Sequence, residues 1–152
     1  MGRTLREALT VYLTDKGIRD EDDPPEQLYK DDWFRFYIGH RSFRILRLGG
    51  AIRSIAVHDA HHLLTGYGTD MRGEAELTGW ELASGGCGRH WIMWIDRIIA
   101  IPTLMLFFPR ASLRAIQRGR NERNLYRIDF DEAQRMEFEE VRRRVTGPTR
   151  AS

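Results

Sequence analysis

The segment that most constrains this fold is residues 51–83, which predicts two helices joined by a tight turn. Residues 51–64 form the first predicted helix, and the Gly-Tyr-Gly sequence at positions 66–68 is typical of a helix end followed by a reversal of the chain. Asp70 is then placed to cap a second helix that extends to about residue 83. The segment therefore predicts a helical hairpin.

Three histidines lie within the first of these helices, at positions 58, 61 and 62. At about 100° per residue, His62 lies about 40° from His58, and Asp59 lies about 60° beyond His62. His58, Asp59 and His62 therefore share a sector of roughly 100°, whereas His61 falls on the other side of His58. Two histidines at positions i and i+4 can bind one metal ion through their ring nitrogens.

The predicted turn brings a fourth candidate ligand to the same place. His62 lies six residues before Gly68 and Glu74 lies six residues after it, so a reversal there sets the two side chains level. The sequence thus predicts a metal site of His58, Asp59, His62 and Glu74. Imidazole nitrogens with carboxylate oxygens favour Zn²⁺, with Fe²⁺ or Mn²⁺ as alternatives. A pair of partly buried histidines that bond only to protein neighbours would show the same spacing.

The signals near both ends of the chain are helical as well. Thr4 and Glu7 have the spacing of a capping box before an apolar helical face, and Gly17 is placed to end that helix. Asp129 and Glu132 repeat the capping-box spacing before a C-terminal helix. Strand-like alternation of useful length is not evident, so the sequence predicts an all-α helical bundle.

The chain as a whole, residues 1–152, suits a single domain. A hydrophobic fraction of 41% and a charged fraction of 30% indicate a globular protein, and a net charge of +2 gives no reason to expect nucleic acid as a partner. Residues 19–32 predict an acidic, proline-containing connector, and residues 146–152 a disordered tail. A lone Cys87 and the lack of a signal-peptide pattern favour an intracellular protein.

Two further segments raise the question of membrane contact. Residues 33–48 mix aromatic residues with arginines, and they predict either a helix packed by one face on the core or a basic amphipathic helix on anionic lipid. Residues 91–108 are the most apolar stretch, but Asp96, Arg97 and Pro102 interrupt it. Because a charged pair near the middle of a bilayer is costly, a buried or interfacial helix is favoured over a transmembrane one.

The four candidate ligands follow the pattern HDxxH-x11-E, which resembles the metal motif of the Coq-four family of ubiquinone (coenzyme Q) biosynthesis. Other segments agree in order. The sequence TLREALTVYLTDKGI resembles the family's N-terminal helix, Gly73–Glu74 with Glu81 resembles its second-helix pattern, and AIQRGRNERNLY resembles the stretch before its C-terminal helix. The resemblance covers residues 3–20 and 56–145 and leaves residues 22–50 poorly matched.

The resemblance implies an α-helical, zinc-containing, dimeric protein at a membrane surface. Because the sequence lacks the targeting extension of mitochondrial members, it implies a bacterial relative in the cytoplasm, peripheral on the inner face of the cytoplasmic membrane. The implied partners are a prenylated quinone precursor or other isoprenoid lipid, a second copy of the chain and other quinone-biosynthesis proteins. The implied activity is that of a lyase, C1 decarboxylation of a polyprenylated 4-hydroxybenzoate with hydroxylation there; the alternative is a non-catalytic prenyl-lipid-binding scaffold with a structural metal.

Two points of the metal chemistry stay open at this stage. Four protein ligands would close a tetrahedral zinc and favour a structural role, whereas three would leave a position for substrate. The resemblance implies that Asp59 is a ligand, but it could instead orient His58 or accept a proton. A third functional class, a phosphohydrolase, would recruit His40 upstream and Asp70 or Asp96 downstream, and would leave the glutamate of the motif unused.

A polyprenyl tail needs a long apolar groove. The candidates to line it, which could equally form the core, are Trp91, Ile92, Trp94, Ile95, Ile98, Leu104, Leu106 and Phe107. Arg120 and Tyr126 could hold a carboxylate or head group, although an arginine at the end of a surface helix is common. The sequence therefore predicts substrate contacts at Trp91, Trp94, Ile98, Arg120 and Tyr126.

Overall fold

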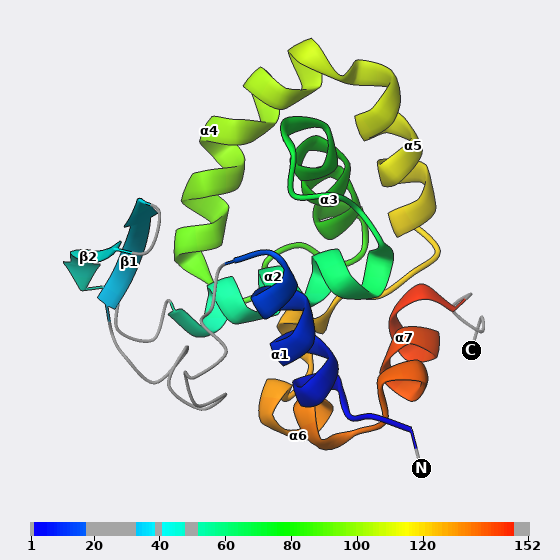
Figure 1. Ribbon diagram of the computed structural model, residues 1–152. Coiled ribbons are helices and arrows are strands. Elements are labelled where there is room, and N and C mark those ends of the chain that lie inside the picture. The colour runs from blue at the N-terminus through cyan, green and yellow to red at the C-terminus, as the bar shows by residue number, and fades with distance from the viewer. Residues whose placement is uncertain (1, 18–32, 39–40, 48–51, 148–152) are drawn as a thin grey trace.

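The computed structural model describes residues 2–17, 33–38, 41–47 and 52–147, and most of them are helical (Figure 1). In chain order the elements are α1 (Leu5–Asp15), β1 (Trp33–Ile38), β2 (Arg41–Arg47), α2 (Ile52–Thr65), α3 (Met71–Ala83), α4 (Trp91–Phe107), α5 (Pro109–Gly119), the short 3-10 helix η2 (Leu125–Arg127), α6 (Phe130–Arg135) and α7 (Phe138–Thr146). The predicted all-α class is confirmed for the body of the chain. The predicted connector at residues 19–32 lies outside the described residues, as do residues 148–152 of the predicted tail.

The helix starts that the sequence predicts are confirmed by their caps. The Thr4 hydroxyl accepts a hydrogen bond from the Glu7 N–H at 3.3 Å, and the Thr4 N–H donates to the Glu7 carboxylate at 2.7 Å. Asp70 accepts from the Gly73 N–H at 2.9 Å at the start of α3. Asp129 caps α6 by accepting from the Asp131 N–H at 2.9 Å, one residue before Glu132 of the predicted capping box. Each cap pairs backbone N–H groups that the first turn of a helix leaves without partners.

The single helix predicted after Asp129 is wrong, because the structure divides it into α6 and α7. Between them, the carbonyl oxygen of Met136 accepts a hydrogen bond from the Leu5 N–H at 2.9 Å, and the Phe138 N–H donates to the carbonyl oxygen of Arg3 at 3.0 Å. These backbone groups pair with the N-terminal segment and are not available for hydrogen bonds within one continuous helix. The first and last helices therefore meet through a short antiparallel bridge.

The helix predicted for residues 33–48 is also wrong, because β1 and β2 form an antiparallel hairpin there. The pairing runs from Trp33 opposite Arg47 to Ile38 opposite Arg41, with an irregularity in register near Phe34. Aromatic and β-branched residues dominate β1, and these residue types favour strands. A short apolar run of this kind does not distinguish a strand from a helix by periodicity alone.

The helix α3 occupies the middle of the body, and α4 and α5 arch around it (Figure 1). Pro102 lies inside α4 without ending it, and the helix bends along its course. Glycines allow α3 and α5 to approach closely, because a Cβ on Gly119 would lie 2.6 Å from the carbonyl oxygen of Trp80. The indole of Trp80 is fully buried, and its N–H donates to the Glu122 carboxylate.

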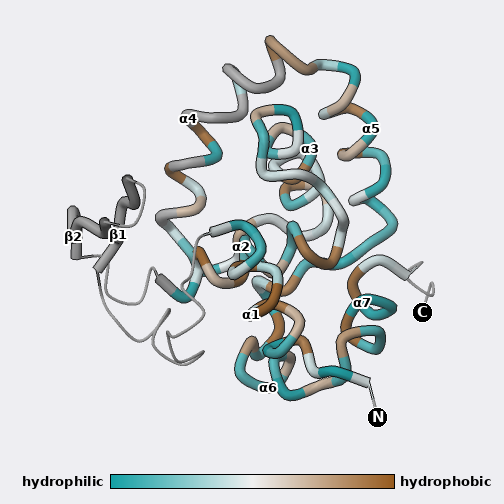
Figure 2. The backbone as a smooth tube through the Cα atoms, viewed as in Figure 1, coloured by the Kyte–Doolittle hydropathy of each residue, from teal (hydrophilic) through white to brown (hydrophobic). Residues whose placement is uncertain are grey.

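The core is formed by apolar side chains from both ends and the middle of the chain. Its largest fully buried members are Leu5, Leu13, Val57, Leu64, Leu77, Trp80, Leu125, Val141 and Val145. Apolar and polar residues alternate along α5 and α7, as expected of helices that bury one face (Figure 2). No helix of the described residues is both long enough and apolar enough to cross a membrane.

Candidate metal centre

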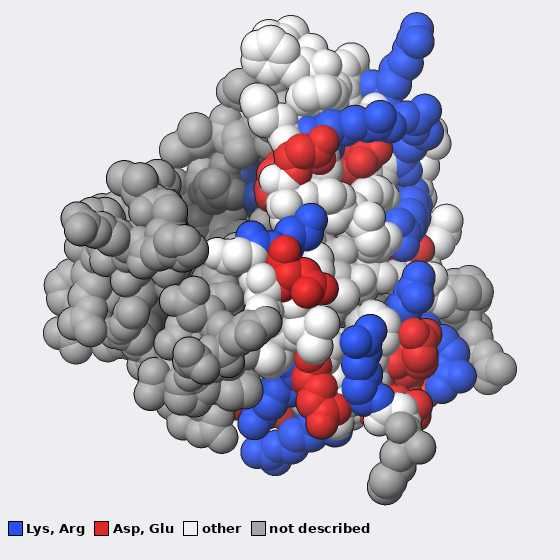
Figure 3. Space-filling model, in the orientation of Figure 1, with Lys and Arg blue, Asp and Glu red and all other residues white. Residues whose placement is uncertain are grey.

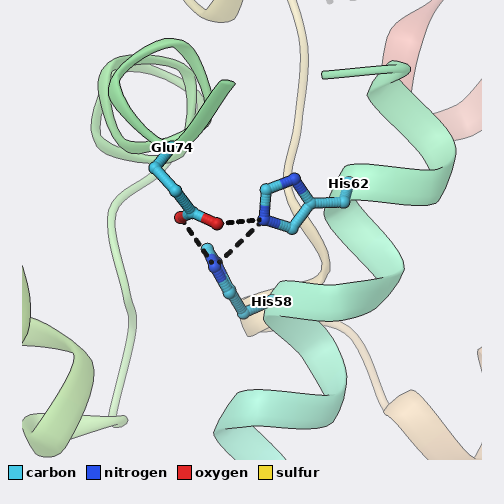
Figure 4. Close-up of side chains that lie close together, drawn as sticks. All are labelled: His58, His62 and Glu74. Atoms are coloured by element: carbon cyan, nitrogen blue, oxygen red, sulfur yellow. Dashed lines mark hydrogen bonds and ion pairs between the residues drawn. The ribbon is translucent and has the colours of Figure 1, made fainter. Parts of the chain in front are cut away.

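Three of the four predicted ligands converge on one point between α2 and α3 (Figure 4). The Nε2 atoms of His58 and His62 lie 3.3 Å apart. The carboxylate of Glu74, in the first turn of α3, places one oxygen 3.4 Å from the His58 Nε2 and the other 3.1 Å from the His62 Nε2. The structure thus contains a possible metal-binding group of two imidazole nitrogens and a carboxylate.

The far side of each ring is held by a hydrogen-bond acceptor. The Nδ1 of His62 lies 3.2 Å from the carbonyl oxygen of Tyr67, to which it donates. The Nδ1 of His58 lies 3.0 Å from Oε1 of Glu81, which is positioned to accept from it. A histidine that donates through Nδ1 presents a lone pair on Nε2, which is how metal-binding histidines are commonly oriented. Both rings therefore turn a nitrogen toward Glu74.

The spacing of the three atoms can be compared with that around a metal ion. Zinc bonds of about 2.0–2.2 Å at the tetrahedral angle set neighbouring ligand atoms about 3.3–3.6 Å apart. The two Nε2 atoms lie 3.3 Å apart, His58 Nε2 lies 3.4 Å from Oε2 of Glu74, and His62 Nε2 lies 3.1 Å from Oε1 of Glu74. Because His62 donates to Tyr67 through Nδ1, its Nε2 carries a lone pair that faces the Glu74 carboxylate. Two acceptors at this distance repel each other unless a cation or a proton lies between them. One ligand atom from each of His58, His62 and Glu74 lies within 4.8 Å of the other two, which is close enough for a possible metal-binding group.

The electrostatics of the group agree with a position for a cation. Burial raises the pKa of the Glu74 carboxyl group. Hydrogen bonds with His58 and His62 outweigh this effect and lower the pKa to about 2. Burial likewise opposes charge on His58, but the carboxylates of Glu81 and Glu74 outweigh it and raise its pKa to about 10. In the metal-free chain, a proton on His58 supplies the positive charge that a metal ion would bring.

The turn between α2 and α3 brings these ligands together. Gly66 adopts a left-handed conformation with φ of 79°, which ends α2 at little strain because glycine has no Cβ. A Cβ on Gly73 would collide with the backbone of Gly68, so a glycine is needed where α3 begins beside the turn. The two helices are not side by side as a predicted hairpin would have them. In Figure 1, α2 lies across the view and α3 is seen nearly end-on, so the helices cross steeply. Glu74 lies where they cross and its carboxylate contacts both histidines.

Beneath the ligands lies a buried polar network that the sequence analysis did not predict. Its centre is Glu81, fully buried, whose Oε2 accepts from Arg97 Nε at 3.0 Å and Nη2 at 2.6 Å. Its Oε1 accepts from Nδ1 of His61 at 2.7 Å and from the Tyr126 hydroxyl at 3.2 Å, in addition to His58. Burial opposes ionisation of Glu81, but the neighbouring histidines and Arg97 hold its pKa well below the ordinary value.

The proton position on His61 is set by its two neighbours. Its Nε2 accepts from the backbone N–H of Leu125 at 2.8 Å, so its Nδ1 carries the hydrogen that is donated to Glu81. Burial lowers the pKa of His61, which agrees with a neutral ring. Asn124 fixes the approach of Leu125, because its side-chain amide donates to the carbonyl oxygens of Glu81 and Gly86. His61 therefore serves as an internal support and faces away from the metal group.

Asp59 is not part of the group that could hold a metal in the structure. It is partly exposed on α2, and its charge acts on Tyr12, whose pKa is raised to about 12 by burial and then by Asp59 and Glu74. Three protein ligands would leave a tetrahedral ion one open position, which is the usual arrangement of catalytic zinc. The resemblance implies that Asp59 is a ligand, but the possible metal-binding group of the structure consists of His58, His62 and Glu74 only.

The predicted substrate residues are distributed differently from the metal ligands. Trp91, Trp94 and Ile98 are exposed on α4, and Arg120 is exposed at the end of α5. Tyr126 is buried and its hydroxyl donates to Glu81, so it belongs to the network beneath the metal group. Of the remaining groove candidates Ile95, Leu106 and Phe107 are exposed, and the side chains of Ile92 and Leu104 lie outside those described.

The phosphohydrolase ligand set gains no support. Asp70 is an exposed helix cap bonded to the Gly73 N–H, and it is absent from the only possible metal-binding group among the described residues. His40 and the side chain of Asp96 lie outside the described part of the structure. Comparisons of the chain with protein-family models, with curated proteins and with solved structures found no match. The site is thus defined by its own geometry, as a possible metal-binding group of His58, His62 and Glu74.

Proposed function

We propose that this chain is a zinc protein that binds the ion through His58, His62 and Glu74. The observation that carries the proposal is the convergence of two Nε2 atoms and a carboxylate at 3.1–3.4 Å, with both Nδ1 atoms held by acceptors. Two nitrogens and one oxygen suit zinc, and Fe²⁺ and Mn²⁺ are the nearest alternatives. Metal analysis of the purified protein distinguishes these ions.

The charge of the site favours an anionic ligand at the fourth position. Two neutral imidazoles and one carboxylate leave a divalent ion with one net positive charge. Glu74 is about one-third exposed, so solvent and ligands can approach from its side. Zinc held there would supply Lewis acidity toward a carboxylate or phenolate oxygen. The chain's own contribution is to hold the three ligand atoms and to keep the buried side of His58 closed by Glu81.

For the substrate we propose a polyprenylated 4-hydroxybenzoate-type intermediate of quinone biosynthesis, which carries such a carboxylate. This part rests on the resemblance of the sequence to the Coq-four family. In the decarboxylation step, the bond between C1 of the ring and the carboxylate breaks, carbon dioxide leaves, and a proton takes its place on C1. The hydroxylation at C1 that the resemblance also implies needs an oxidant and is not part of this proposal. An open coordination position supports the catalytic alternative, because a closed four-ligand site would favour a structural ion.

The test combines metal analysis with mass spectrometry of lipids that co-purify with the chain. We expect about one zinc per chain and a prenylated aromatic lipid. Incubation with a prenylated 4-hydroxybenzoate labelled in its carboxyl group should then release labelled carbon dioxide in amounts that depend on bound zinc. A chain that carries neither metal nor prenyl lipid would contradict the proposal. A chain with zinc and lipid but no release of label would support the scaffold alternative.

The exposed surface of α4 favours this second function, a lipid-binding scaffold at a membrane. Large apolar side chains on its outer surface are exposed at 39–77%: Trp91, Trp94, Ile95, Ile98, Leu106 and Phe107. Arginines 110 and 114 of α5 are exposed. Basic side chains lie beside an uncharged surface at the top of the molecule, over the region where α4 and α5 meet (Figure 3). Apolar side chains flanked by cations are typical of proteins that rest on anionic lipid.

Substitution on this surface is expected to weaken membrane binding. Ile98→Asp places a charge where the side chain is 69% exposed, so it should reduce co-flotation with vesicles that contain phosphatidylglycerol about tenfold or more. Ile128→Asp is the matched control, because Ile128 is also exposed but lies between η2 and α6. Equal flotation of the two variants, or none by the unsubstituted chain, would contradict a membrane contact through α4.

The affinity for zinc is expected to rise with pH. A nitrogen must lose its proton before it binds a metal, and the pKa of His58 is raised, against the effect of burial, to about 10 by Glu81 and Glu74. Below that pKa, the apparent affinity falls about tenfold for each unit by which the pH is lowered. The zinc Kd measured by chelator competition should therefore fall about 100-fold between about pH 6 and pH 8. A Kd independent of pH would show that the ion displaces no proton from His58.

A further inference from the structure

A feature that the proposed function leaves unassigned is the buried pair of Glu81 and Arg97. Glu81 is 0% exposed and Arg97 is 3% exposed, and two hydrogen bonds of 3.0 and 2.6 Å join them. Arg97 belongs to α4 and Glu81 to α3, so the pair connects the outer helix to the metal ligands. Buried pairs are costly to form, which suggests that this one has a role beyond stability.

The Nδ1 atom of His58 has two neighbours of opposite character. Oε1 of Glu81 lies 3.0 Å away and can only accept a hydrogen bond, since the carboxylate is ionised. Nη2 of Arg97 lies 2.9 Å away and can only donate. A neutral His58 that accepts from Arg97 must carry its hydrogen on Nε2, which blocks the nitrogen that faces Glu74. A His58 that donates to Glu81 leaves Nε2 free.

The surroundings fix Glu81 in the orientation that favours the second arrangement. Arg97 holds Oε2, while the Nδ1–H of His61 and the hydroxyl of Tyr126 point at Oε1. His61 cannot exchange its donor for an acceptor, because its other nitrogen accepts from the Leu125 N–H. Oε1 is thus held next to His58 as an acceptor. Nη2 of Arg97 binds the opposite oxygen through one N–H, and its other N–H is the competing donor to Nδ1 of His58.

From this geometry we infer that Glu81 is a positioning residue for the metal site. It holds the hydrogen of His58 on Nδ1, so that Nε2 is free to bind the ion, and Arg97 locks Glu81 in place. The inference rests on the proposed zinc site and extends it by naming the group that determines its affinity. Loss of the hydrogen-bond partner behind a metal-binding histidine typically lowers metal affinity by about 10–100-fold.

The first test replaces the carboxylate by the amide of the same shape. In Glu81→Gln, donors face both sides of the amide, so its oxygen can serve only one of them. With the oxygen toward Arg97, the NH₂ faces Nδ1 of His58; with the oxygen toward His58, the NH₂ repels Arg97 and the side chain loses its lock, so either orientation weakens the arrangement that leaves Nε2 free. The zinc Kd is expected to rise about 10–100-fold in protein that remains folded by circular dichroism. Glu76→Gln is the matched control, because Glu76 is on the same helix and pairs only weakly with Arg72 at 3.5 Å. Wild-type affinity in folded Glu81→Gln would overturn the inference.

Two double variants separate positioning from fold stability, even if Glu81→Gln does not fold. Both E81Q/R97M and E81M/R97M remove the buried charges together, which avoids an unpaired ion and is tolerated by many proteins. In E81Q/R97M the amide can turn its oxygen to His58, so near wild-type zinc affinity is expected. In E81M/R97M nothing accepts from Nδ1, and the Kd should be about 10–100-fold higher at equal charge. Equal affinities of the two would overturn the inference.

The unsubstituted chain separates this inference from the proposed function. Absence of zinc binding by the unsubstituted chain would contradict the zinc site itself. Zinc binding by that chain, together with equal affinities of the two double variants, would leave the site standing and remove only the role of Glu81. The absorption spectrum of Co²⁺ bound in place of zinc provides a second readout, because it reports the ligand arrangement and is insensitive to global stability.

Discussion

Glu74→Ala is expected to abolish tight zinc binding while leaving the chain folded. Glu74 supplies the only carboxylate of the three-residue group, with oxygens 3.1 and 3.4 Å from the two imidazole nitrogens. Its side chain is about one-third exposed in the first turn of α3, so its removal leaves no large cavity. The zinc Kd should rise by more than about 100-fold, beyond the effect of a supporting residue. Dialysis followed by metal analysis measures the loss.

Glu76→Ala is the matched control for this substitution. Glu76 lies one half-turn further along α3, carries the same group and forms an ion pair with Arg72 at the surface. It should keep the full zinc content, since it is absent from the candidate metal group. Stoichiometric zinc in Glu74→Ala would contradict the ligand assignment. Loss of the fold together with zinc would instead favour a structural ion, because the metal would then contribute folding energy.

Trp80→Ala is expected to destabilise the chain by about 3–5 kcal/mol, the usual cost of truncating a large core aromatic. The indole is 0% exposed, and its N–H donates to Glu122 from the middle of the arch of α4 and α5. A domain of this size is stable by roughly 5–15 kcal/mol, so the variant should unfold at much lower urea concentration. Trp91→Ala, at a tryptophan 66% exposed on α4, should change the unfolding free energy by less than about 0.5 kcal/mol. Similar midpoints for the two variants would contradict the assigned core.

The sequence predicts the three members of the possible metal-binding group, though not the absence of Asp59 from it, because their positions depend on local geometry. The spacing of His58 and His62 requires only that α2 is a helix, and the level of Glu74 requires only a turn near Gly66. These are properties of one continuous segment. The steep crossing of α2 and α3 could not be predicted, since it depends on how α3 packs against α5, yet it leaves Glu74 in place.

The support of the site could not be predicted in the same way. Glu81 and Arg97 are 16 residues apart on different helices, and their contact depends on how α4 folds over α3. The ring of His61 falls outside the sector of the metal ligands, and its partner, the N–H of Leu125, lies 64 residues along the chain. Periodicity shows which residues share a helical face, but it does not show which helix will cover that face. The hairpin of β1 and β2 was missed for a related reason, because its aromatic residues suit either element.

The bridge that joins Arg3 to Phe138 and Leu5 to Met136 has a consequence for the order of folding. During synthesis two of the packing partners of α1, the helices α6 and α7, emerge more than a hundred residues after it. A helix of 11 residues is marginal on its own in water, so α1 has little reason to persist before they arrive. The contacts of α1 with α6 and α7 therefore form late, and until then the nearer helix α2 can cover part of its apolar side.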